Sequence, residues 1–354
     1  MKALIAMSGG VDSSVAAYLT LQKGLECIGA TMRLYDRPDF ESTCCSLEDV
    51  EDARSVAHRL GMCYYVFNFT GDFEEKVIRK FICSYENGLT PNPCIDCNRF
   101  LKFEQLLQRA LVLGCDYVVT GHYARISRDA ETGRFLLKKA VDKAKDQTYF
   151  LYSLTQEQLK HTLFPLGEME KQQVRQIAQG QNFINARKRD SQDICFVPDG
   201  DYLAFMERYT GKQYPQGNYL DLQGNIVGKH KGAVGYTFGQ RKGLGIALGE
   251  PVYVCGKDMT ANTVTIGPNE ALFHTTLLAN DWNWISIPEL THPVRVLAKA
   301  RSRMTEQSAW VYPEANGFAR VEFDEPQRAI TPGQAIVLYD GDTVIGGGTI
   351  TNVI

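Results

Sequence analysis

The residues with the clearest chemical potential lie near the start of the chain, where the polar residues 8–14 (SGGVDSS) follow the apolar residues 3–7. Gly9 and Gly10 let the backbone adopt positive φ angles and approach an anion closely. A helix that begins at such a turn presents backbone N–H groups and the positive end of its dipole. The carboxylate of Asp12 beside phosphates implies a bridging Mg²⁺. The segment therefore predicts a phosphate-binding loop, with three serine hydroxyls as further donors.

Two better-known phosphate loops do not match. A Walker loop needs Gly-Lys-Ser/Thr and a dinucleotide fingerprint needs Gly-x-Gly-x-x-Gly, and residues 8–14 contain neither pattern. A capped helix after a strand, with no ligand, is the simpler alternative. The segment resembles the SGGxDS loop of the ATP-pyrophosphatase (PP-loop) superfamily, whose members cleave ATP to AMP and pyrophosphate.

Three cysteines form the second group of chemically active residues. Cys94 and Cys97 lie in residues 90–98 (TPNPCIDCN), and Cys195 lies in residues 190–196 (DSQDICF). Cys97 is expected at the N-terminal edge of a helix that starts at Arg99, where the helix dipole favours a thiolate. A lone Cys-x-x-Cys is also compatible with zinc, a redox pair or an iron–sulfur cluster. Zinc is disfavoured because no second ligand pair is present, whereas the three thiols could hold three corners of a [4Fe–4S] cluster.

The remaining cysteines divide into two sets. We expect those in apolar surroundings to be small core residues, and these are Cys27, Cys63, Cys83, Cys115 and Cys255. The pattern assigns no role to Cys44 and Cys45.

The elements that must position these residues alternate between strand and helix. Apolar runs predict strands over residues 3–7, 27–32, 64–69 and 117–120, and helical spacing predicts helices over 15–23, 47–60, 73–85 and 99–113. This alternation predicts an α/β fold, a Rossmann-like parallel sheet with helices on both faces. Ligands of such sheets bind beyond the carboxyl ends of the strands. Ser8, Met32 and Gly121 lie at such ends and are expected to converge.

The pattern changes from about residue 201. Residues 218–221 and 226–227 flank a hairpin-like turn, and short alternating strands recur at 294–297, 308–312, 320–323 and 335–339. Such spacing predicts a small β-barrel. We therefore expect a catalytic α/β domain over residues 1–200, a central β-rich domain over 201–276 and a C-terminal β-barrel over 277–354. A basic stripe suited to phosphate contacts is expected on one face of a barrel strand, formed by Arg295, Lys299, Arg301 and Arg303.

Composition is consistent with several domains and gives little information on partners. The chain has 354 residues, of which 44% are hydrophobic and 22% charged, with a formal net charge of −3. No apolar run approaches the ~20 residues of a membrane helix, and the chain enters its first strand without a leader. We expect a cytoplasmic protein without a membrane partner. A small negative net charge does not exclude a local nucleic-acid site.

Six motifs in order, SGGVDSS, NPCIDCN, GHYA, KDQTYFL, SQDICF and GYTFGQRKGLGIA, resemble those of the tRNA-specific 2-thiouridylases over nearly the whole chain. The resemblance implies a transferase that binds ATP with Mg²⁺ and 2-thiolates the wobble uridine of tRNA. In that reaction O2 of the uridine is adenylated, and sulfur then comes from a cysteine persulfide loaded by a sulfur-donor relay protein. AMP and pyrophosphate are released.

The resemblance also implies roles for individual residues. Cys97 would be the nucleophile and Cys195 would carry the persulfide, and the two would end as a disulfide that must be reduced. The implied ATP site comprises Ala6, Met7, Ser8, Gly9, Gly10, Val11, Asp12, Ser13, Met32 and Gly121. The implied contacts with tRNA and its target base are Asn92, Pro93, Cys94, His122, Lys145, Asp146, Gln147, Arg301, Ser302 and Gln334.

One departure from the family pattern and two competing functions stay open at this point. Many members carry Asp where this chain has Cys94, so a [4Fe–4S] cluster on Cys94, Cys97 and Cys195 that supplies sulfide is an alternative to the persulfide. An ATP-dependent amide-forming ligase could use the same loop without nucleic acid. A non-catalytic tRNA-binding protein could retain the loop as a relic. Neither function needs both Cys97 and Cys195.

Overall fold

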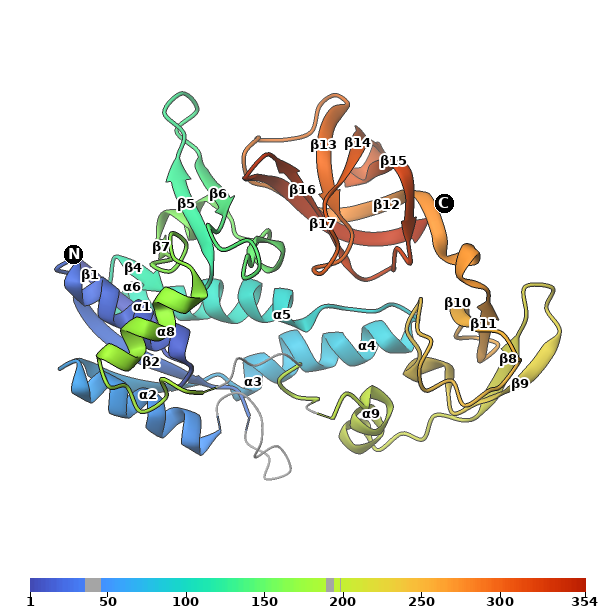
Figure 1. Ribbon diagram of the computed structural model, residues 1–354, viewed down its shortest axis with the longest axis horizontal. Helices are drawn as coiled ribbons and strands as arrows, with labels where there is room; N and C mark the ends of the chain where they lie inside the picture. Colours follow the sequence, from blue (N-terminus) through green and yellow to red (C-terminus); the bar gives the residue numbers. More distant parts are fainter. Residues whose placement is uncertain (36–45, 189–193, 198) are drawn as a thin grey trace.

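The computed structural model describes residues 1–35, 46–188, 194–197 and 199–354. Cys44, Cys45 and residues 189–193 therefore lie outside the described residues. A parallel sheet lies at one end of the long axis and a small β-sheet at the other (Figure 1). The β-barrel lies above the helices that run between them.

The first sheet has the order β3-β2-β1-β4-β7, and all its neighbours are parallel. Its strands are β1 (Lys2–Ala6), β2 (Glu26–Arg33), β3 (Cys63–Asn68), β4 (Tyr117–Val119) and β7 (Thr162–Leu163). Leu4 belongs to one buried cluster, whereas Ala3 and Ile5 belong to another. Successive side chains of a strand point to opposite faces, so both faces are covered. The predicted α/β fold is confirmed.

Helices on each face supply the partner side chains. One face packs against α1 (Val11–Gln22), α2 (Leu47–Arg59) and α8 (Lys171–Gly180). The other packs against two long helical stretches. The first comprises α3 (Thr70–Phe73), η2 (Glu74–Arg79) and α4 (Lys80–Glu86), and the second comprises α5 (Pro93–Asp96), η3 (Cys97–Gln105) and α6 (Leu106–Val112). The remaining helices of the described residues are short, namely η4 (Thr148–Phe150), α7 (Gln156–Lys160), α9 (Tyr202–Thr210), η5 (Ala233–Gly235), η6 (Asn269–Leu272) and η7 (Ala315–Gly317).

Two predicted helix starts were wrong, and both corrections move active residues into a first turn. The first helix begins at Val11 rather than at residue 15. The later one begins at Pro93 rather than at Arg99 because the Asn92 side chain caps it and proline suits the first helical position.

The central sheet has the order β10-β11-β8-β9. It consists of β8 (Gly217–Leu220), β9 (Ile226–His230), β10 (Tyr253–Asp258) and β11 (Thr263–Gly267). The antiparallel pairing of β8 and β9 confirms the predicted hairpin.

The C-terminal strands close into a six-stranded barrel, because β12 pairs with both β15 and β17. These strands are β12 (Phe273–Trp284), β13 (Val294–Lys299), β14 (Gln307–Pro313), β15 (Ala319–Arg328), β16 (Ala335–Asp340) and β17 (Thr343–Val353). The hairpin of β5 (Ala124–Arg128) and β6 (Phe135–Lys139) extends this sheet from the N-terminal part, with Lys138 opposite Thr343. One buried cluster is shared, since it contains Leu137 and Tyr149 together with Val337 and Tyr339.

Two further expectations need correction. The basic stripe does not form, because β13 ends at Lys299 and Arg301 and Arg303 lie in the turn that follows. Of the five cysteines expected in the core, Cys27 and Cys115 are buried, Cys255 is half-buried, and Cys63 and Cys83 are exposed.

Among the residues that the structure describes, no helix combines the length and apolar character needed to cross a bilayer.

Candidate active site

The loop between β1 and α1 has the backbone geometry of an anion site. Gly9 has a φ of +73°, and a Cβ added to it would lie 2.3 Å from the backbone oxygen of Asp49 on α2. Only glycine satisfies both conditions. Gly10 is the N-cap of α1 and has no side chain to cap it, so the first N–H groups of the helix are directed toward a ligand position.

The serines of the loop play different parts. Ser13 Oγ accepts from the backbone N–H of Ser8 at 3.2 Å and donates to the carbonyl oxygen of Gly10 at 3.0 Å. Ser14 is fully buried and donates to the same carbonyl oxygen at 3.0 Å. The expectation that Ser14 offers a donor to phosphate is therefore wrong, and its hydroxyl stabilises the turn. Ser8 is exposed.

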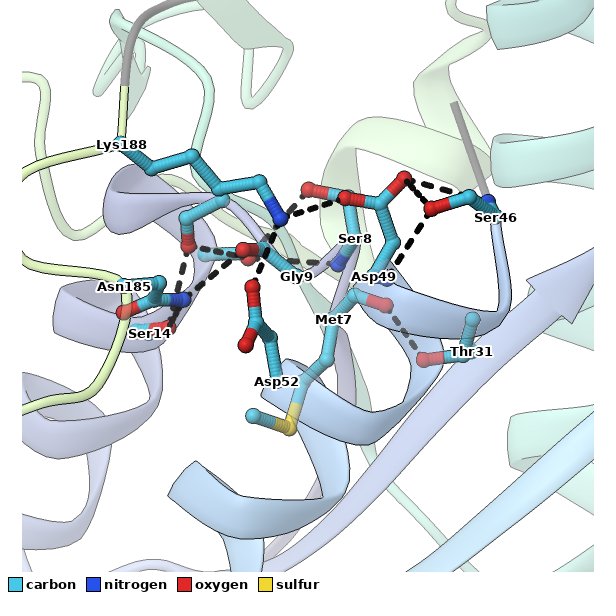
Figure 2. Close-up of polar contacts among 12 residues, drawn as sticks. Met7, Ser8, Gly9, Ser14, Thr31, Ser46, Asp49, Asp52, Asn185 and Lys188 are labelled. Carbon is cyan, nitrogen blue, oxygen red and sulfur yellow. Dashed lines mark hydrogen bonds and ion pairs between the residues drawn. The ribbon is translucent and has the colours of Figure 1, made fainter. Parts of the chain in front are cut away.

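Asn185 supports this loop from the segment that follows α8. Its side chain is 3% exposed, and its Nδ2 donates to the Gly9 carbonyl oxygen at 2.8 Å and to Ser14 Oγ at 2.9 Å (Figure 2). No local pattern in the sequence pointed to Asn185, because the contact spans 176 residues.

Lys188 binds the neighbouring helix. Its Nζ lies 2.7 Å from Asp49 Oδ1 and 2.6 Å from Asp52 Oδ2 (Figure 2). The other oxygen of Asp49 accepts from the backbone N–H and the hydroxyl of Ser46, at 3.1 and 3.0 Å. The Asp49 side chain thus contacts both Lys188 and the residue that caps α2, and the Asp49 backbone packs against Gly9.

The carboxylate of Asp12 has two partners from distant segments. Lys171 Nζ donates to both of its oxygens at 2.8 Å, and the Tyr123 hydroxyl donates to Oδ1 at 2.9 Å. The turn itself contains no lysine. Lys171 comes from the start of α8, so a cation stands beside the loop, where it suits an anionic ligand.

The strand ends converge as expected. A Cβ on Gly121 would lie 2.7 Å from the backbone of Asp12 and Ser13, so the end of β4 packs on the first turn of α1. Thr31 Oγ1 donates to the Met7 carbonyl oxygen at 2.6 Å and fixes the end of β1 to β2 next to Met32.

Cys94 and Cys97 lie on one helix. Asn92 Oδ1 accepts from the backbone N–H of Cys94 at 3.2 Å, and Pro93 occupies the first helical position. Cys94 is exposed in the first turn and Cys97 is half-buried one turn later. The predicted position of Cys97 at the helix edge was wrong, because Cys94 occupies that place.

Cys195 is held by its neighbour Phe196, which is 1% exposed. The Phe196 ring lies 5.0 Å from that of Phe81 and 5.9 Å from that of Phe73. The Cys195 sulfur lies 4.0 Å from the hydroxyl of Tyr35, just beyond the end of β2. Four of the predicted residues pack against this same buried cluster, namely Ala6, Met32, Cys97 and Cys195. The end of β1, the end of β2 and both cysteines therefore contact one and the same buried cluster.

The [4Fe–4S] cluster on Cys94, Cys97 and Cys195 stays an alternative to the persulfide. Within the described ranges, no three His, Cys, Asp or Glu side chains lie close enough together to hold a metal ion.

His122 lies beside the aromatic rings of Phe103 and Phe164, each 5.9 Å away, and its Nδ1 is 2.6 Å from Thr120 Oγ1. Burial, and the charge of Lys102 to a smaller degree, lowers the pKa of His122 well below its ordinary value. The imidazole is therefore neutral at physiological pH.

Residues 145–147 form a loop beside β5. Asp146 accepts from the backbone N–H of Ala140 at 3.0 Å, and Gln147 Oε1 accepts from that of Tyr123 at 2.8 Å. Lys145 is half-buried.

The side chains of Arg301 and Gln334 each form a hydrogen bond from the barrel to another domain. Arg301 Nη2 donates to the Phe238 carbonyl oxygen at 3.1 Å and to the Thr331 hydroxyl, and burial lowers the pKa of the guanidinium. Ser302 follows in the same turn. Gln334 Nε2 donates to the Thr90 carbonyl oxygen at 2.8 Å, on the loop that leads to Cys94.

Comparisons with known proteins agree with this geometry. Three family models match in chain order: a tRNA methyl transferase HUP domain over residues 1–199, a tRNA methyl transferase PRC-barrel domain over 203–268 and an aminomethyltransferase beta-barrel domain over 274–350. The tRNA-specific 2-thiouridylase MnmA of Acetivibrio thermocellus is 53% identical over 354 residues, which is 99% of each chain. MnmA of Clostridioides difficile is 51% identical over 352 residues, covering 99% of this chain and 98% of the relative.

Among solved structures, a 4-thiouridine synthetase in an RNA complex with bound ATP matches 55% of this chain and 44% of its own, at 20% identity and a TM-score of 0.34. That score is too low to carry weight. The identities over the full chain and the ordered match of all three family models are sufficient: the chain belongs to the tRNA-specific 2-thiouridylase family.

Proposed function

We propose that this protein catalyses the ATP-dependent 2-thiolation of the wobble uridine of tRNA, as the names of its relatives indicate for them. The observation that carries the proposal is the common cluster beneath Ala6, Met32, Cys97 and Cys195. The strand that leads into the loop and both thiols contact the same buried cluster, which supports a site that uses ATP and cysteine sulfur together. An amide-forming ligase would use the loop but has no need of the thiols.

The phosphate loop and its neighbours act in the adenylation step. Backbone N–H groups at Gly9, Gly10 and the start of α1 hold the phosphates, and Lys171 and Ser8 add donors. Uridine O2 attacks the α-phosphorus, pyrophosphate leaves, and O2 becomes part of a good leaving group. Magnesium would be held by the nucleotide phosphates with Asp12 as the single loop carboxylate, and it would neutralise charge on the pyrophosphate. Lys171 must then share Asp12 with the metal.

Sulfur transfer uses Cys195 and Cys97. The terminal sulfur of a Cys195 persulfide forms a bond to C2, and AMP leaves. The Cys97 thiolate then attacks the Cys195 sulfur. The S–S bond to the transferred atom breaks, the electron pair stays on the sulfur bound to C2, and a Cys97–Cys195 disulfide forms. An external thiol reductant restores both thiols, and a persulfide-bearing donor protein reloads Cys195.

The tRNA contacts form the remaining part of the proposal. Asn92, Pro93 and Cys94 would face the target base, and His122, residues 145–147, Arg301, Ser302 and Gln334 would contact the rest of the tRNA. The proposed compartment of the reaction is the cytoplasm.

The test separates adenylation from sulfur transfer. Cys97→Ser and Cys195→Ser should each abolish 2-thiouridine, measured by mass spectrometry of digested tRNA, while AMP release still depends on added tRNA. AMP release that does not depend on added tRNA would favour the amide-forming ligase instead.

The cluster alternative is tested by an anaerobic absorption spectrum with iron and sulfide analysis of the protein and its Cys94→Ala variant. Colourless protein that thiolates tRNA from a persulfide donor supports the proposal. A broad band near 400 nm with roughly four irons, lost in the variant, would overturn the sulfur step.

A further inference from the structure

The two partners of Asp12 are both held by one surface loop, residues 140–148. The Tyr123 hydroxyl donates to Asp12 Oδ1 at 2.9 Å and Lys171 Nζ donates to both carboxylate oxygens at 2.8 Å. Neither Tyr123 nor Lys171 belongs to the phosphate loop. Their own positions therefore decide where the Asp12 carboxylate points.

Tyr123 is tied to the loop by two backbone contacts with Gln147. The Gln147 N–H donates to the Tyr123 carbonyl oxygen at 3.0 Å, and the Tyr123 N–H donates to Gln147 Oε1 at 2.8 Å. The side chain and the backbone of Gln147 thus fix both polar groups of the Tyr123 main chain. A shift of Gln147 must move Tyr123, whose hydroxyl reaches Asp12.

Lys171 is tied to the same loop through Asp142. The backbone N–H of Lys171 donates to Asp142 Oδ2 at 3.0 Å. Asp142 Oδ1 accepts from the N–H of Ala144 at 3.0 Å, and the Asp142 carbonyl oxygen accepts from the N–H of Lys145 at 3.1 Å. The start of α8 is therefore bonded to the turn that presents Lys145.

The two ends of the loop are hydrogen-bonded to each other, and its outer face is exposed. Asp146 accepts from the Ala140 N–H at 3.0 Å and from the Thr148 hydroxyl at 2.7 Å, so it holds the two ends of the loop together. Val141 is 48% exposed, and Lys143 and Ala144 are exposed as well. A large ligand can contact the outer face of the loop, and the inner face transmits the contact to Tyr123 and Lys171.

We propose that Tyr123 and Asp142 are positioning residues that make the placement of Asp12 depend on tRNA bound at residues 143–147. This inference rests on the proposed function, in which the same loop contacts tRNA. The enzyme then activates ATP efficiently only when tRNA is present, and wasteful cleavage of ATP is avoided. The coupling runs through one hydroxyl on the Tyr123 side and one carboxylate on the Asp142 side.

The experiment compares AMP release with and without saturating tRNA, together with the Kd for tRNA, in the full-length protein. Tyr123→Phe removes a single oxygen and Asp142→Ala removes the second tie, while Asp142→Asn retains one acceptor. Tyr214→Phe is the matched control, because the Tyr214 hydroxyl donates to Glu86 at 2.8 Å and takes no part in the contacts of Asp12, Tyr123 and Asp142 described above.

We expect Tyr123→Phe and Asp142→Ala to lower the tRNA-stimulated kcat by about tenfold or more, as misplacement of a reacting group does. The Kd for tRNA should stay within about twofold of the wild-type value, since neither change removes a phosphate contact. Asp142→Asn should recover part of the loss, and the control should behave as wild type.

Three outcomes would overturn the inference. Stimulation by tRNA could be unchanged in Tyr123→Phe, the loss could follow the Kd for tRNA in proportion, or Asp142→Asn could be no better than Asp142→Ala. Failure of the proposed function has a different signature, because wild-type protein itself would then form no 2-thiouridine. Should Asp142→Ala fail to fold, Tyr123→Phe decides the question alone.

Discussion

The Nε2 atom of Gln334, on the barrel, donates to the carbonyl oxygen of Thr90 at 2.8 Å, on the loop that leads to Cys94. The Thr90 N–H in turn donates to the Pro332 carbonyl oxygen at 2.9 Å. A Cβ on Gly333 would lie 2.8 Å from the Thr90 nitrogen. The turn before β16 therefore holds the loop that precedes the helix of Cys94 and Cys97.

Loss of the hydrogen bond from Gln334 to Thr90 should slow sulfur transfer. Gln334→Ala loses the donor to Thr90, so the loop before Cys94 and Cys97 samples more positions, and we expect kcat for 2-thiouridine formation to fall by about tenfold. Gln327→Ala is the control, because the Gln327 side chain donates to the Glu325 carbonyl oxygen of the same strand, at 2.7 Å. Equal rates for the two variants would contradict the role of the Gln334 contact.

The close approach of Gly9 to α2 can be separated from its backbone conformation. Gly9 and Gly114 have similar φ angles of +73° and +70°, but a Cβ would meet Asp49 only at Gly9. Gly114→Ala should lose about 1–2 kcal/mol of stability from the left-handed backbone, and Gly9→Ala should lose more because its Cβ also meets Asp49. Only Gly9→Ala should lose affinity for a non-hydrolysable ATP analogue, by about tenfold or more. Equilibrium dialysis of both variants measures the affinity for the ATP analogue. Equal affinities would argue against the loop as the phosphate site.

The Lys257 ammonium gives stability a pH dependence. Burial lowers its pKa from 10.5 to about 8, and its Nζ donates to the Tyr236 carbonyl oxygen at 2.8 Å. Between these pH values the unfolded chain binds more protons than the native protein, so the free energy of unfolding rises with pH in that window. Below the native pKa the contribution is constant.

Urea unfolding of wild type and Lys257→Met at pH 7, 8, 9 and 10 measures this slope. The rise should be present in wild type and absent in the variant. Lys242→Met, which changes an exposed lysine of the same domain, should keep it. A variant curve parallel to that of wild type would show that Lys257 titrates normally.

Lys188 should stabilise the junction of α2 with the phosphate loop. Lys188→Met leaves the neighbouring carboxylates of Asp49 and Asp52 without their shared cation. Because the lysine side chain is 31% exposed, the loss of unfolding free energy should lie near the low end for charged hydrogen bonds, roughly 1–2 kcal/mol. Asp52→Asn added to Lys188→Met should recover part of it in a double-mutant cycle. Additive effects would contradict a shared ion pair.

Local patterns predicted the sheet and the phosphate loop because both depend on neighbouring residues. The apolar run 3–7 and the glycines at positions 9 and 10 are informative without any distant contact. Asn185 and Lys171 were missed for the opposite reason, since each reaches the loop only after the chain has folded. Sequence spacing holds no signal for contacts over more than 150 residues.

Other errors have equally local causes. The sequence predicts a helix start at Arg99, but Pro93 at a first helical position with Asn92 before it starts the helix earlier. Cys63 and Cys83 have apolar neighbours, but an edge strand and an outer helix face leave their thiols exposed. The basic stripe failed because strand alternation stops at Lys299.

The buried cluster that joins Leu137 and Tyr149 to Val337 and Tyr339 has a practical consequence. A fragment that ends near residue 200 would open half of a hydrophobic interior to water, at a cost of about 25 cal/mol for each square ångström of apolar surface. We expect such a fragment to be insoluble, and its rescue by a separately expressed barrel would have to rebuild that interior. We therefore expect a chimera of two relatives to fold well only when the N-terminal domain and the barrel come from the same parent.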